Sequence, residues 1–142
     1  MRLKNTSRYP EAEVRALVEF ACRGVDMTGV QVNVKNSRQA YRGRAYNGVP
    51  SVSPASRLQT VSRLVVVAVG QDQQFPVVNY YSTKLKRVPR VELQNWREAL
   101  VKVAAHEARH VHQYRHDKPR SEVDAEKWAV RRLEEYRAST TT

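Results

Sequence analysis

Cysteine is almost absent from this sequence, since Cys22 is the only one among 142 residues. One cysteine excludes an intramolecular disulfide, suits a reducing compartment, and leaves any metal to histidine and carboxylate ligands. Long apolar runs are absent as well. The longest, residues 64–69, is far too short to cross a bilayer. No apolar segment of signal-peptide length follows the charged N-terminus. We therefore expect a cytoplasmic protein without a membrane partner.

Acidic residues are few relative to basic ones. Fourteen Asp and Glu stand against 25 Lys and Arg, which gives a formal net charge of +11. Such a balance indicates acidic partners such as nucleic acid, and its plain alternative is a set of solvated basic faces. The densest basic cluster comprises Lys84, Lys86, Arg87 and Arg90. No zinc ribbon, recognition helix or Gly-rich phosphate loop accompanies it, so charge alone suggests nucleic acid as a partner.

The length and the apolar content of 41% predict a single domain over residues 1–142, with flexible ends at 1–9 and 138–142. The spacing of apolar residues predicts an amphipathic helix over 10–23. Alternating valines predict a strand at 30–34, and residues 40–48 suggest an irregular edge strand. The apolar run within 63–70 is typical of a central strand, and 76–81 of another edge strand.

The periodicity becomes helical after Pro89. Leu93, Trp96, Leu100 and Val103 form one apolar stripe that runs into a His-Glu-x-x-His motif, and a final helix is expected from Glu122 to about residue 136. Strands followed by helices predict an α+β fold with an N-terminal helix, a three- or four-stranded twisted sheet and two packed C-terminal helices.

The motif places His106 and His110 four residues apart on one helix. At about 3.6 residues per turn, both imidazoles project from the same face and can reach one zinc ion. Glu107 is offset from that face, so we expect it to act as the general base on a metal-bound water rather than as a ligand. The motif fixes only three positions in five, and its position on a helix with a buried stripe supports it.

A catalytic zinc takes three protein ligands, so a third is required, and two residues compete for that position. His116 lies ten residues after His106, a spacing similar to the metzincin motif. The metzincin glycine is replaced here by Gln113, however, and no methionine follows the motif. The other candidate is Glu122, at the start of the last helix, where it shares one face with Glu126.

The motif and the segment Ser-Glu-Val-Asp-Ala-Glu-Lys-Trp-Ala from residue 121 together resemble minimal gluzincins, including IrrE-like and HtpX-like peptidase domains. The resemblance covers roughly residues 93–133. It implies a zincin-like fold, Glu122 as the third zinc ligand and Glu126 as the residue that supports a ligating histidine. Asp or Asn is commoner than Glu at the supporting position.

The resemblance implies a zinc metallopeptidase that cleaves protein or peptide substrates with Glu107 as the base. It further implies that a sheet edge near the active helix, such as 40–47 or 77–81, receives the peptide as an added strand. The alternative is a basic, non-catalytic binding protein on a peptidase-like fold, which contacts nucleic acid or a protein partner.

Overall fold

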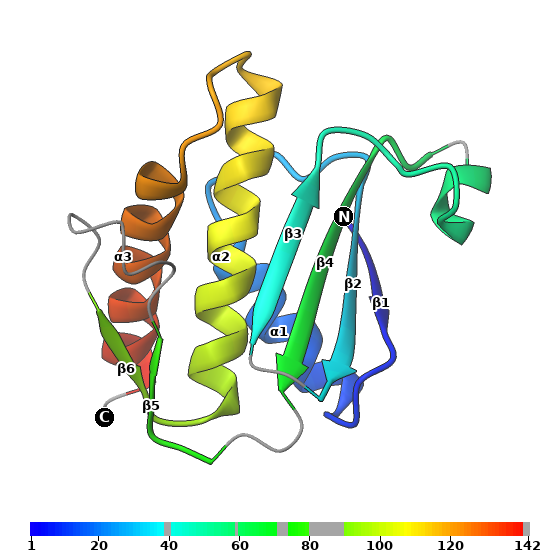
Figure 1. The fold of residues 1–142 in the computed structure, drawn as a ribbon. Helices are drawn as coiled ribbons and strands as arrows, with labels where there is room; N and C mark the ends of the chain where they lie inside the picture. The colour runs from blue at the N-terminus through cyan, green and yellow to red at the C-terminus, as the bar shows by residue number, and fades with distance from the viewer. Residues whose placement is uncertain (39–40, 59, 71–73, 80–89, 141–142) are drawn as a thin grey trace.

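The computed structural model describes residues 1–38, 41–58, 60–70, 74–79 and 90–140. Its elements confirm the α+β class (Figure 1). Their bounds, in chain order, are β1 Arg2–Asn5, α1 Glu11–Ala21, β2 Val30–Ser37, β3 Arg42–Tyr46, the 3₁₀ turn η1 Pro54–Arg57, β4 Arg63–Gly70, β5 Val77–Asn79, β6 Val91–Leu93, α2 Trp96–Arg115 and α3 Glu122–Thr140.

Four strands form the main sheet in the order β1-β2-β4-β3. β1, β2 and β4 are parallel, and β3 runs antiparallel to β4 at the edge. The alternating valines of β2 pair with every second residue of β4, such as Val32 with Val65 and Val34 with Val67. Paired residues point to the same face, and these valines are buried in the core. The sheet therefore has one apolar face, as the alternation in 30–34 predicts.

α1 and α2 lie on that apolar face, and α3 packs against α2 on the side away from the sheet (Figure 1). α2 packs beside the edge strand β3 and also contacts α1 and α3. It begins after Asn95, whose side chain accepts a hydrogen bond from the Glu98 amide. α3 begins after Ser121, whose hydroxyl accepts from the Asp124 amide. Two N-caps thus fix where α2 and α3 start, and with them the positions of their first turns.

The sequence pattern does not predict two of the strands, β1 and β6. The sequence predicts a flexible segment over residues 1–9, but Arg2–Asn5 form β1, which pairs with β2. The apolar stripe predicts that Leu93 belongs to the helix that follows, but Val91–Leu93 form β6 and pair with β5 in a separate two-stranded sheet. α3 also extends to Thr140 instead of ending near residue 136. In each case backbone pairing or packing with a distant segment decides the conformation.

Cys22 is buried and unpaired, and burial raises the pKa of its thiol to about 12. No helix in the described ranges combines the length and apolar composition that a membrane span requires. The basic cluster predicted around Lys84, Lys86 and Arg87 lies outside the described residues, and so does part of the predicted strand 76–81.

Candidate metal centre

Three side chains that commonly ligate metals meet where α2 lies beside the first turn of α3. His106 Nε2 is 2.9 Å from Glu122 Oε2, and His110 Nε2 is 3.2 Å from the same oxygen. One ligand atom from each residue lies within 4.8 Å of the others. Two ligands of a tetrahedral zinc ion, each at about 2.1 Å from it, are about 3.4 Å apart. The group therefore has the composition and the spacing to hold one metal ion.

The Nδ1 atom of each histidine is engaged by a different side chain. His106 Nδ1 is 3.1 Å from Glu126 Oε1, and His110 Nδ1 is 2.9 Å from Gln113 Oε1. A carboxylate and an amide oxygen only accept, so both histidines donate from Nδ1. Their Nε2 lone pairs are consequently directed toward Glu122, in the tautomer that a metal ligand needs.

This arrangement brings three acceptor atoms together at short range, and a cation or a proton is needed between them. Burial by itself lowers the pKa of His106, but the hydrogen bond to Glu126 and the charges of Glu107 and Glu126 raise it overall. Burial lowers the pKa of His110. A proton on His106 Nε2 and a metal ion are alternative ways of satisfying the same acceptors, so the two compete.

His116 is not part of the group that can hold a metal among the described residues. It is the C-cap of α2, and its ring lies 4.3 Å, centroid to centroid, from the ring of His112 on the same helix. Gln113, which stands at the position of the metzincin glycine, accepts a hydrogen bond from His110. Its side-chain amide also donates to the carbonyl of Ser121 and accepts from the N–H of Ser121. Gln113 thus connects the end of α2 to the start of α3.

Glu126 lies behind His106 and is fully buried. Its second oxygen is 2.6 Å from the ammonium of Lys102, which lies one turn before His106 and is itself buried. Burial alone raises the pKa of Glu126, but His106 and Lys102 together hold it below its usual range. The buried chain Lys102–Glu126–His106 therefore keeps a carboxylate ionised at the back of the site.

Glu107 is buried against β3, and burial raises its pKa to about 7 despite the nearby charges of His106 and Arg120. The backbone N–H of Ala45 donates to its carboxylate. Its Oε2 atom is buried and has no hydrogen-bond partner among the described residues. An unsatisfied buried carboxylate oxygen is costly in a fold and is typical of a functional site.

Glu107 fits against β3 because position 43 is a glycine. A Cβ atom at Gly43 would lie 2.7 Å from Glu107 Cγ and 2.9 Å from Val103 Cγ1, closer than real Cβ contacts. We therefore expect Gly43→Ala to displace α2 or the Glu107 side chain and to lower the free energy of unfolding by about 1–3 kcal/mol. Urea unfolding measures this change.

Gly48→Ala is the matched control, because a Cβ atom there would meet nothing within 4 Å. Its free energy of unfolding should stay the same or rise by up to about 1 kcal/mol. Equal stabilities for the two variants would contradict the close packing of Glu107 against β3.

Two residues beside the ligand group, Arg120 and Tyr114, are not predicted from the sequence. Arg120 donates from Nε to Glu122 Oε1 at 3.0 Å, and its Nη1 reaches Ala45 O at 3.4 Å. Arg120 also donates to the Tyr114 hydroxyl, which in turn donates to Ala45 O. The ring centroid of Tyr114 lies 6.5 Å from that of His110.

Lys102 is not singled out by the motif either, and its sequence signal is a charged residue between Val101 and Val103 in the predicted buried helix. No family model, curated protein or solved structure matches the chain. The convergence of His106, His110 and Glu122 therefore carries the functional argument.

Proposed function

We propose that the protein is a zinc-dependent metallopeptidase of gluzincin type on a zincin-like fold. The observation that carries the proposal is the convergence of His106 Nε2, His110 Nε2 and Glu122 Oε2 beside the buried carboxylate of Glu107. Two imidazoles and one carboxylate form a ligand set that catalytic zinc sites use. A bound zinc ion supplies a Lewis acid that lowers the pKa of a water toward about 7 and polarises a carbonyl.

Glu107 has the role of general base in this proposal. Its raised pKa of about 7 matches a group that takes a proton from water and passes it to a leaving amine near neutral pH. Glu126 and Gln113 orient the two histidines through their Nδ1 atoms. Arg120 holds the second oxygen of Glu122 and so keeps Oε2 directed at the histidines.

The edge strand β3 is the proposed substrate-binding strand. The N–H group of Ala45 meets Glu107, and its carbonyl meets Tyr114 and Arg120, so both groups point away from β4. In an antiparallel pair, backbone N–H and C=O groups of residues i and i+2 point to the same side of the strand. The N–H and C=O of Gly43 therefore also point away from β4, to the open edge of β3. A peptide that adds to this edge would run directly past Glu107.

Zinc content and cleavage test this proposal together. We expect the wild type to bind about one zinc ion per chain and to cleave a fluorescein-labelled unfolded protein, with chelation abolishing the cleavage. Glu122→Gln removes the charge of one ligand but keeps its shape, so it should lose zinc. At a free zinc concentration of 100 times the Kd, wild-type protein should gain about 2.7 kcal/mol of stability, and the variant should gain much less.

Glu134→Gln is the matched control, since Glu134 is an exposed glutamate on the same helix α3. It should bind zinc and cleave the substrate like the wild type. A wild-type protein that binds no zinc would overturn the proposal. Equal zinc binding by Glu122→Gln and Glu134→Gln would remove Glu122 from the ligand set.

A further inference from the structure

The outer face of the four-stranded sheet, which is turned away from the helices, carries a second feature. The strand register places its outward residues in rows across the sheet. One row runs Lys4, Asn33, Val66, Arg44, and the next contains Lys35, Ala68 and Arg42. Arg2 begins a third row that ends at Tyr46. We call Arg2, Lys4, Lys35, Arg42 and Arg44 the basic sheet face; all five are exposed.

The charged residues of these strands are all basic. None of the residues of β1, β2, β3 and β4 is Asp or Glu. Lys4 and Arg44 stand at the two ends of one row, three strand spacings or about 14 Å apart. Charges that extend over this distance match a ligand that carries repeated negative charges rather than one anionic group.

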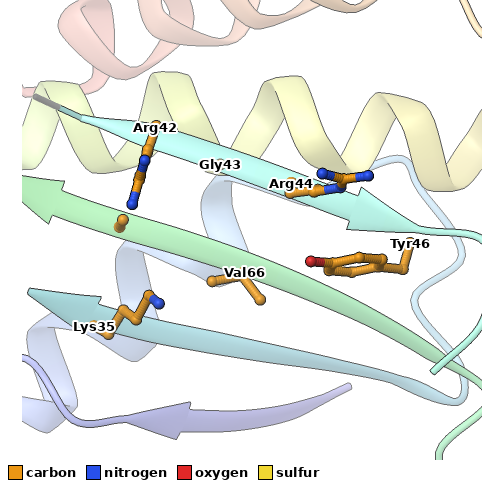
Figure 2. Close-up of a pocket in the computed structure, with 7 residues that line it drawn as sticks. Lys35, Arg42, Gly43, Arg44, Tyr46 and Val66 are labelled. Atoms are coloured by element: carbon orange, nitrogen blue, oxygen red, sulfur yellow. The ribbon is translucent and has the colours of Figure 1, made fainter. Parts of the chain in front are cut away.

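The face is also hollowed over β4 and β3 (Figure 2). A depression of about 430 Å³ is lined by the small apolar residues Val66 and Ala68. Lys35, Arg42 and Arg44 also line it, from β2 and β3 (Figure 2). The ring of Tyr46 lines one end, with the Arg44 guanidinium carbon 5.0 Å from its centroid. The lining of the hollow therefore combines apolar side chains, an aromatic ring and cationic groups.

We infer that the basic sheet face binds single-stranded nucleic acid. Phosphates would contact the lysines and arginines, and a base would enter the hollow and stack beside Tyr46. An open sheet surface accommodates splayed bases, whereas duplex DNA is commonly read by an element that projects into a groove. None of the large exposed apolar residues of the described chain, Met1, Val52 and Val78, belongs to the four strands of this face, so the strands supply no large apolar anchors for a membrane surface. This inference is independent of the proposed peptidase.

Fluorescence anisotropy with a labelled 12-nucleotide oligo(dT) tests the inference over a range of salt concentrations. Each phosphate contact contributes a slope of about −0.7 to log K against log salt concentration for single strands. The double variant Lys35→Gln/Arg44→Gln should therefore bind more weakly, with a slope that is smaller in magnitude by about 1.4. Tyr46→Leu should weaken binding by at least about fivefold at fixed salt, because stacking is lost.

The matched control is Lys127→Gln/Arg131→Gln, which removes two exposed cations from α3 and leaves the sheet untouched. It should retain the wild-type affinity and slope. Thermal unfolding shows that each variant is folded. The inference is overturned if the wild type shows no salt-dependent binding or if both double variants lose affinity equally. Equal affinity for a 12-base-pair duplex, or binding only to anionic vesicles or polyglutamate, would also overturn it.

Discussion

Replacing Glu107 by Gln should lower peptide cleavage by about 10²–10⁴-fold while zinc binding is retained, because general-base catalysis contributes a factor of this size. Glutamine cannot take a proton from water at neutral pH. It keeps the carbonyl oxygen that accepts the Ala45 N–H, and it has the same shape against Gly43. Glu107 does not belong to the ligand group of His106, His110 and Glu122, so the metal site should be unaffected.

The measurement compares steady-state cleavage and zinc stoichiometry in the same preparations of wild type and Glu107→Gln. The exposed Glu134→Gln on α3 again shows the effect of an amide substitution by itself. Unchanged cleavage would exclude Glu107 as the base. A variant that keeps zinc, while neither it nor the wild type cleaves any substrate, would favour a non-catalytic binding protein.

The sequence predicts the parts of the fold that depend on local pattern. The run 64–69 indicates the central strand β4, and the valines at 30, 32 and 34 indicate β2. β1 is short and polar, and it becomes a strand because β2 offers a free edge. Leu93 fits the helical stripe of the residues after it, so only the pairing with Val77 and the cap at Asn95 reveal β6.

The candidate site likewise contains residues that a local motif predicts and residues that only the packing of distant segments brings together. His106, Glu107 and His110 lie within five residues and form a recognisable motif. Glu122 is predicted as a ligand only through the resemblance to gluzincins. Lys102 and Glu126 are 24 residues apart, and Arg120 meets Ala45 across 75 residues. Such contacts depend on how α2, α3 and β3 pack, which no local pattern encodes.

Removing the Lys102 ammonium should produce the largest loss of stability in the site. Its partner Glu126 is fully buried and would be left as a charge without its cation. Breaking a buried ion pair on one side costs about 3–5 kcal/mol, which is a large part of the 5–15 kcal/mol that typical domains have. Lys102→Met should therefore lower the free energy of unfolding by that amount in urea denaturation, and the exposed Lys127→Met should leave it unchanged.

The double variant Lys102→Met/Glu126→Leu separates the two roles of this pair. Replacing both members of a buried ion pair by apolar residues is often neutral, so most of the lost stability should return. In the double variant, however, His106 lacks the Glu126 acceptor for its Nδ1 atom, and loss of such a partner weakens metal binding by about 10–100-fold. A refolded double variant with wild-type zinc affinity would show that Glu126 only balances the charge of Lys102. A double variant no more stable than Lys102→Met would show that the ion pair is not the source of the loss.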